Sequence, residues 1–307
     1  MEQNKKYAET HSVCYKIAGL KLRINSDEPV DWDCMLPSCA PFRQNFYDRE
    51  NTVCEINVKY GNSREIPPSA KLLTEISDLF AYRIRVLESE NHYIIARIYE
   101  ENCHSLMISD KNFEKSDVYL YPERQNYRDG LSLFLMMAFA QTVILHKTVL
   151  LHASVVVKDG FGYAFLGKSG TGKSTHSSLW MRHIEGTKLL NDDNPALRIG
   201  DDGEIYICGT PWSGKTPCYI NEWVKLKALV RLEQAPQNRF LQMKGANAMI
   251  SLLPSCSSMR WNNKLYSTLC GILEETIQKT TVARLECLPN ADAACLCYEE
   301  IQRITNN

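Results

Sequence analysis

A glycine-rich loop occupies residues 167–174, with the sequence GKSGTGKS. The apolar run FGYAFL precedes it and predicts a strand, and the residues from 173 to about 185 predict a helix. Glycines let a backbone turn its N–H groups inward, and together with the helix N-terminus these groups form a concave anion site. The sequence therefore predicts an α/β fold, in which a mixed sheet with flanking helices carries a phosphate-binding P-loop.

The loop matches the pattern G-x-x-x-x-G-K-[ST] at every fixed position. In this pattern the side chain of Lys173 reaches the β- and γ-phosphates of a nucleotide, and the hydroxyl of Ser174 ligates Mg²⁺. A chance match in a glycine-rich turn is the alternative, but the strand before the loop and the helix after it favour phosphate binding. The residues expected to contact the nucleotide are Gly167, Lys168, Ser169, Gly170, Thr171, Gly172, Lys173, Ser174 and Thr175.

About 20 residues after the loop, the run KLLNDDNPALRI predicts a strand with two adjacent aspartates, Asp192 and Asp193, at its end. A carboxylate at the end of a strand beside such a loop is suited to bind Mg²⁺. The second carboxylate is then available to accept a proton from an attacking hydroxyl, because crowding of like charges raises one pKa. We expect metal binding by Ser174, Asp192 and Asp193. A simple turn is the alternative, since Asp-Asp-Asn-Pro has good turn chemistry.

Two further polar residues are candidates for catalysis. His152 lies in the strand-like run LLHASVVV, where a period of two places it on the same face as Ser154. Lys215 ends the stretch GTPWSGK and could neutralise phosphate charge in a transition state. A surface turn explains this second stretch equally well. The expected catalytic residues are thus His152, Asp192, Asp193 and Lys215.

The chain before residue 126 predicts a smaller, mostly β N-terminal α+β domain, with strands such as CEINVKY and YIIARIYE separated by Gly- and Pro-containing breaks. We expect this domain, 1–125, to recognise a substrate or to be accessory. Residues 122–130 predict a linker, and 131–145 predict a buried helix too short to cross a bilayer. The catalytic domain is expected over 126–307.

Composition limits the classes of partner. The net charge is −1, which argues against a nucleic-acid surface. The 12 cysteines include no C-x-x-C pair, and the N-terminus has no signal-peptide pattern, so a reduced, cytoplasmic protein without membrane partners is expected. Assembly into a homo-oligomer is left open.

The order of His152, the loop and the aspartate pair resembles the catalytic domain of HPr kinase/phosphorylase and its smaller relatives, over roughly residues 148–235. This layout is shared with ATP-dependent phosphoenolpyruvate carboxykinase. The resemblance implies an ATP- and Mg²⁺-dependent kinase, with the nucleotide on Lys173 and Ser174, the aspartates as metal ligand and base, and His152 in a supporting role. The acceptor would be a hydroxyl of a peptide, protein or small molecule.

The sequence departs from the HPr enzyme at two positions of this pattern. Ala153 stands where that enzyme has a glycine after the histidine, and Thr175 stands where it has an acidic residue. The C-terminal signature associated with phosphorylase action is also missing, so HPr itself is not the expected acceptor. Two other functions remain open from the sequence: a non-catalytic nucleotide-binding regulator and a carboxykinase-like enzyme.

Overall fold

The computed structural model describes residues 10–44, 51–61, 64–77, 82–100, 102–122, 127–214 and 216–306. Within it the chain divides into two compact units, Met1–Val143 and Ile144–Asn307. The sequence predicts this boundary at residue 125. The helix Tyr127–Thr142, which belongs to the first unit, accounts for the difference. Both units contain a mixed sheet with a few helices, which is compatible with the expected α/β class.

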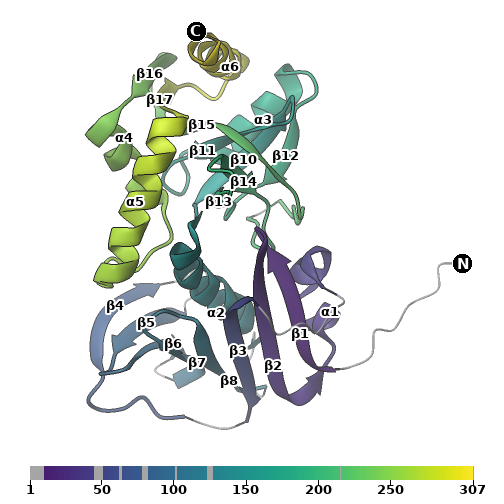
Figure 1. The fold of residues 1–307 in the computed structure, drawn as a ribbon, viewed down its shortest axis with the longest axis vertical. Helices are drawn as coiled ribbons and strands as arrows, with labels where there is room; N and C mark the ends of the chain where they lie inside the picture. The colour runs from purple at the N-terminus through teal and green to yellow at the C-terminus, as the bar shows by residue number, and fades with distance from the viewer. Residues whose placement is uncertain are drawn as a thin grey trace, which may run out of the picture. The chain divides into compact units, whose positions relative to one another are not determined.

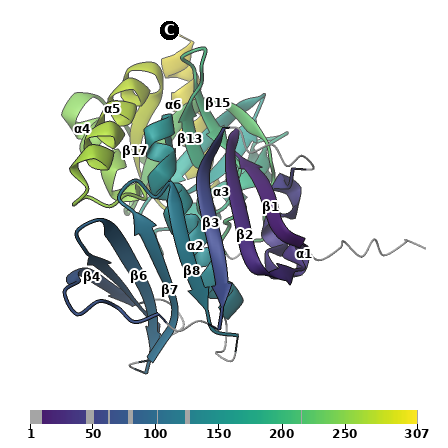
Figure 2. The same ribbon diagram turned by 60° about the horizontal axis from the view of Figure 1, so that its bottom comes forward.

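The first unit is built on an eight-stranded sheet with the strand order β1-β2-β3-β8-β7-β6-β5-β4. The pairs β2–β3 and β3–β8 are parallel and the other neighbours are antiparallel. Figure 2 shows β1, β2 and β3 side by side. The elements of this unit are β1 (Thr10–Ile17), β2 (Leu20–Val30), α1 (Trp32–Met35), a 3₁₀ turn (Pro37–Phe42), β3 (Thr52–Tyr60), β4 (Lys71–Ser77), β5 (Arg83–Glu88), β6 (His92–Tyr99), β7 (Asn102–Asp110), β8 (Lys115–Leu120) and α2 (Tyr127–Thr142).

Alternation of side chains explains why these segments form strands. In β2 the side chains of Leu20, Leu22 and Ile24 are buried, while Lys21 and Arg23 between them are half-buried. Successive side chains in a strand point to opposite faces, so one face of the sheet packs inward. Residues 13–24, VCYKIAGLKLRI, form a hairpin of β1 and β2, because Ala18 and Gly19 both adopt positive φ and reverse the chain.

The apolar helix α2 begins earlier than predicted and belongs to the first unit. It packs against β3, β7 and β8, with Leu131, Phe134 and Leu135 fully buried. Gly130, predicted as part of a linker, lies inside the helix. A Cβ at this position would come within 2.8 Å of Ser105 Oγ, so the close approach of Ser105 favours a glycine here. The rest of the predicted linker, 123–126, lies outside the described residues.

The helical segment Tyr127–His146 is also longer than expected, with 20 residues and a mean hydropathy of 1.4. By length and composition it could cross a membrane. However, 61% of its most apolar window is buried inside the structure, as in a core helix of a soluble protein. The predicted burial of this helix is confirmed, whereas the prediction that it is too short to span a bilayer was wrong.

The second unit contains a nine-stranded sheet (Figure 1). Seven of its strands follow the order β12-β10-β11-β15-β14-β13-β9, and the other two are β17, which pairs with β15, and β16, which pairs with β17. The pairs β11–β15 and β15–β17 are parallel. Its elements are a 3₁₀ turn beginning in the first unit (Val143–His146), β9 (Thr148–Leu150), β10 (Ala153–Lys158), β11 (Phe161–Leu166), α3 (Lys173–His183), β12 (Lys188–Asn191), β13 (Ala196–Ile199), β14 (Ile205–Cys208), β15 (Trp223–Gln234), β16 (Arg239–Met243), α4 (Gly245–Leu252), a 3₁₀ turn (Leu253–Ser255), α5 (Asn263–Lys279), β17 (Thr281–Cys287) and α6 (Ala291–Thr305).

The core of this unit lies between the sheet and the helices α3 and α6. Trp180 of α3 and Ile301 of α6 are fully buried against Phe165, Val230 and Leu285 of the central strands. Burying large apolar side chains of this kind contributes about 1.5–3 kcal/mol each. This packing holds α3 against the sheet. It therefore fixes the position of the N-terminus of α3, which directly follows the glycine-rich loop.

Candidate functional site

The glycine-rich loop joins β11 to α3, as the sequence predicts. Gly170 has φ +80° and Gly172 has φ +104°, a left-handed conformation that favours glycine. Gly172 is the N-cap of α3, and because it has no side chain it cannot cap the first amides of the helix. The first amides of the helix are therefore available to an anion, and the positive end of the helix dipole points the same way.

Lys173, the first residue of α3, folds back over the loop. Its ammonium nitrogen donates to the Gly167 carbonyl at 3.2 Å and to the Lys168 carbonyl at 3.5 Å. It also lies 2.8 Å from Nε2 of His152. Only 9% of Lys173 is exposed, and burial lowers the pKa of its ammonium group, against the opposing effect of the Asp193 and Asp192 carboxylates. The lysine is thus held at the loop by neutral acceptors.

His152 connects this lysine to the aspartate pair. It lies at a bend between β9 and β10 rather than inside one long strand. Its backbone N–H donates to the Ser255 carbonyl at 2.7 Å and not to a neighbouring strand of the sheet. Its Nδ1 lies 3.1 Å from a carboxylate oxygen of Asp193. With Lys173 donating to Nε2, the proton of a neutral imidazole is on Nδ1 and is donated to Asp193. The three side chains form a continuous chain of contacts.

Asp192 is held by a second, more buried network. Ser154 of β10 donates to Asp192 Oδ1 at 2.7 Å, and the Ser154 hydroxyl lies 2.6 Å from that of Ser177 on α3. Asp192 is only 6% exposed. Among the described residues its other oxygen, Oδ2, has no hydrogen-bond partner, which leaves that oxygen available to a ligand. The side chain of Asp193 is 31% exposed, and both its oxygens are engaged, by His152 and by Asn194.

Asn191 shapes the turn that carries both aspartates. It is fully buried, and its Oδ1 accepts from the backbone N–H groups of Asp193 and Asn194 at 3.0 Å each. Its Nδ2 contacts the carbonyl oxygens of Thr210 and Trp212 at 3.3 Å. One side chain thus ties the end of β12 to the segment GTPWSGK. Sequence reasoning missed this role, although Asn191 stands directly before the aspartate pair.

The segment GTPWSGK comes close to the aspartates. A Cβ at Gly214 would meet the Asp192 carbonyl oxygen at 3.0 Å and Asp193 Cβ at 3.4 Å. The Trp212 side chain of this segment is buried. Lys215, predicted to be catalytic, lies outside the described residues.

The remaining loop residues face outward. Lys168, Ser169, Ser174 and Thr175 are exposed, and the Ser174 hydroxyl has no hydrogen-bond partner in the described chain. Lys168 and Ser169 share a hollow of about 420 Å³ with Arg231 of β15, whose guanidinium donates to the Ser251 carbonyl at 3.0 Å. The guanidinium of Arg231 therefore adds a positive charge beside the loop. Asp201 and Asp202 lie at the tip of the β13–β14 hairpin, as expected for a turn.

Oxygen ligands at this site suit Mg²⁺, which binds through one or two carboxylates together with substrate phosphates and water. Asp192 Oδ2 and the Ser174 hydroxyl are the oxygen atoms here that could serve as ligands to such an ion. No group of three or more His, Cys, Asp or Glu side chains in the described ranges forms a ready-made metal cluster. All 12 cysteines are free thiols.

Comparison with solved structures finds similar chains, whereas the other two comparisons find none. No protein-family model matches the chain, and no curated protein matches it. A solved structure of the HPr(Ser) kinase/phosphatase from Coxiella burnetii is similar, with 14% sequence identity and a TM-score of 0.29. The match covers 51% of this chain and 95% of that chain. A relation this distant leaves the family of the chain open.

Proposed function

We propose that this chain is an ATP- and Mg²⁺-dependent kinase that transfers the γ-phosphoryl group of ATP to a hydroxyl group. The chain of contacts Asp193–His152–Lys173 carries the proposal, because it joins a candidate base to the lysine of an anion-binding loop. Phosphoryl transfer asks a protein mainly for positioning and for neutralisation of charge. The loop, its helix and the aspartate pair supply both at one place.

The two aspartates have different surroundings, and we assign them different roles. Asp192 is buried and has one oxygen fixed by Ser154, so its Oδ2 is the metal ligand, together with the Ser174 hydroxyl. Mg²⁺ bound there would neutralise negative charge on the β- and γ-phosphates. Asp193 is more exposed and can be reached by an acceptor hydroxyl, so it is the base.

The reaction then follows from these positions. The oxygen of the acceptor hydroxyl attacks the γ-phosphorus, and the bond between that phosphorus and the β,γ-bridging oxygen breaks. The bridging electron pair leaves with ADP, while the hydroxyl proton passes to the Asp193 carboxylate. Lys173 moves from His152 to the phosphates when the nucleotide binds. His152 remains hydrogen-bonded to Asp193 and keeps that carboxylate oriented.

The acceptor we propose is a hydroxyl of a peptide, protein or small molecule other than folded HPr. Ala153 and Thr175 replace the residues that the HPr enzyme has at these positions of the pattern. The first unit offers a mostly β surface, in which the edge strand β4 pairs only with β5 among the described strands. An extended peptide can bind such an edge through backbone hydrogen bonds.

The test is transfer of label from γ-labelled ATP. Purified protein with Mg²⁺ is offered HPr, peptides and metabolites from extract of its own cells, and products are separated by mass and charge. We expect label in a hydroxyl-bearing product, and loss of that label with Asp193→Asn. ATP binding without transfer to any fraction would favour a nucleotide-binding regulator. Efficient labelling of HPr would contradict the proposed acceptor class.

A further inference from the structure

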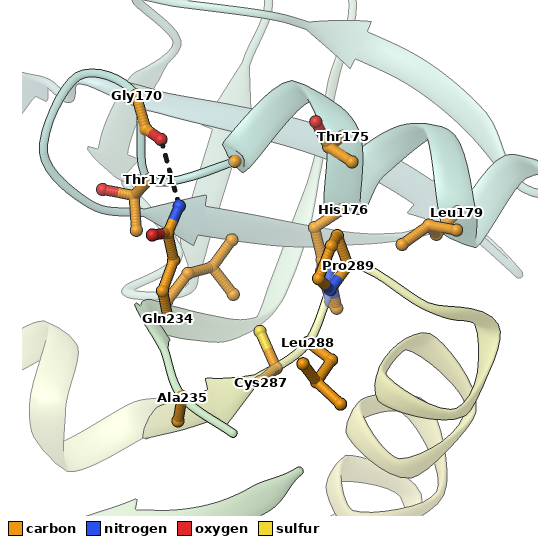
Figure 3. A pocket seen from close by; sticks show the side chains of 12 residues that line it. Gly170, Thr171, Thr175, His176, Leu179, Gln234, Ala235, Cys287, Leu288 and Pro289 are labelled. Carbon is orange, nitrogen blue, oxygen red and sulfur yellow. Dashed lines mark hydrogen bonds between the residues drawn. The ribbon is translucent and has the colours of Figure 1, made fainter. Parts of the chain in front are cut away.

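A cavity of about 440 Å³ opens on the side of α3, next to the glycine-rich loop (Figure 3). Its walls come from α3, from the end of β15 and from the segment after β17. We call it the α3 cavity. The residues that shape it are His176, Leu179, Leu232, Gln234, Leu288 and Pro289.

The topology of the sheet explains why these segments meet. Strands β11, β15 and β17 are neighbours and run parallel, so their carboxyl ends lie at one edge. Ligands of open α/β sheets bind at that edge. The loop after β11 forms the anion site, and the segments after β15 and β17 form the cavity beside it. A ligand held by its phosphates in the loop can therefore extend into the α3 cavity.

The walls suit a flat apolar ring. Leu179, Leu232 and Leu288 present aliphatic side chains, and Pro289 adds a fourth apolar surface. Gln234 closes one end, where its Nε2 donates to the Gly170 carbonyl at 3.4 Å (Figure 3). Small-molecule sites commonly combine apolar walls with a few placed polar groups.

His176 supplies such a polar group. It is 3% exposed, and its Nε2 accepts a hydrogen bond from the indole N–H of Trp180 at 3.1 Å. Nε2 therefore carries no proton, and the neutral ring has its proton on Nδ1. Among the described residues this Nδ1–H has no partner, and Figure 3 shows the ring directed toward the cavity beside Pro289. A ligand acceptor in the cavity can take this hydrogen bond.

We infer that the α3 cavity binds the purine base of the nucleotide whose phosphates occupy the loop, and that His176 donates its Nδ1–H to a ring nitrogen of that base. This inference rests on the proposed ATP-dependent function and adds the cavity that holds the base of that nucleotide. A purine offers two flat apolar faces for the leucine walls and several ring nitrogens that accept hydrogen bonds. Inorganic triphosphate would use the loop alone.

Calorimetric titration with ATP, CTP and inorganic triphosphate tests the inference. For the unmodified protein we expect ATP to bind at least about tenfold more tightly than triphosphate or CTP, because only the purine fills the cavity. His176→Phe should weaken ATP binding by about three- to tenfold, the value of one hydrogen bond, and leave triphosphate binding unchanged. His176→Gln keeps a donor and an acceptor and should restore ATP affinity.

Controls separate loss of the base contact from loss of the fold. His183→Phe changes the exposed histidine at the end of the same helix, outside the cavity, and should bind ATP normally. Photolabelling of the unmodified protein with 8-azido-ATP needs no variant, and peptide mapping should find the label within 175–179 or 287–289. This measurement decides the matter if His176→Phe does not fold.

The outcomes distinguish this inference from the proposed function. Equal affinities for ATP and triphosphate, or photolabel only outside the cavity, would overturn the base site and leave the phosphate site standing. Failure of both ATP and triphosphate to bind would overturn the nucleotide-dependent function, and the base site with it. Normal ATP affinity in His176→Phe would remove the histidine from base recognition.

Discussion

The ammonium nitrogen of Lys173 lies 2.8 Å from Nε2 of His152, which in turn reaches Asp193 through Nδ1 at 3.1 Å. The lysine thus has a neutral partner when no phosphate occupies the loop. In the proposed function the same ammonium group binds the phosphates, so nucleotide binding would exchange one partner for the other.

Replacing Lys173 by alanine should abolish binding of Mg²⁺-ATP without unfolding the protein. Its positive charge is the main side-chain attraction for the phosphates, whereas backbone geometry shapes the loop. Calorimetry measures the affinity, and circular dichroism checks the fold. Lys188→Ala, on the exposed end of β12, is the matched control and should bind normally. Undiminished affinity and turnover in Lys173→Ala would rule out a phosphate loop.

Asp192→Asn and Asp193→Asn should behave differently. The first should raise the Mg²⁺ concentration needed for turnover, because it weakens a metal ligand. The second should leave nucleotide binding nearly normal and lower the rate by about 10²–10⁴-fold, the usual contribution of a general base. Titration of Mg²⁺ against both variants separates the two roles. Wild-type behaviour in both would show that the pair is only a turn.

Asn191→Ala should disturb catalysis without touching any reacting group. The buried amide holds the turn of Asp193 and contacts the carbonyls of Thr210 and Trp212. Leaving such groups unsatisfied costs about 1–3 kcal/mol in the free energy of unfolding. We expect a lower rate with nearly unchanged ATP affinity, measured beside urea denaturation. An unchanged rate would mean that the turn holds its shape without this side chain.

The stability of the fold should fall as the pH is lowered from about 6.5 to 4. Burial lowers the pKa of His176 from 6.5 to about 4, so within this window the unfolded chain binds a proton that the folded chain does not. Stability from this group is fully present above pH 6.5 and is lost toward pH 4, by about 3 kcal/mol in total.

Urea denaturation at pH 7 and pH 4.5 measures this loss, and the variant His176→Gln isolates it. Glutamine does not titrate, and it retains an acceptor for the Trp180 indole. The difference in unfolding free energy between the two pH values should be smaller in the variant by about 2 kcal/mol. Equal differences in both proteins would show that His176 is not held in the neutral form.

The sequence by itself determined what depends on near neighbours. The strand, loop and helix around 167–174 could be predicted because glycines and an apolar run specify them locally. The same is true of the aspartates after β12, although KLLNDDNPALRI forms two strands, β12 and β13, with the aspartates in the turn between them. Period-two geometry predicted that His152 and Ser154 share one side of a strand. His152 lies instead at a bend before β10, and each of the two residues contacts one aspartate.

Only the tertiary structure decided which distant segments meet. Gly130 is typical of a break in sequence, yet it lies inside α2, which packs against β3, β7 and β8 and belongs to the first unit. The α3 cavity joins His176 to Leu288, more than a hundred residues later, because β11, β15 and β17 are neighbouring parallel strands. Parallel neighbours need long connections, so their pairing is set by packing of the whole sheet and leaves no local signal in the chain.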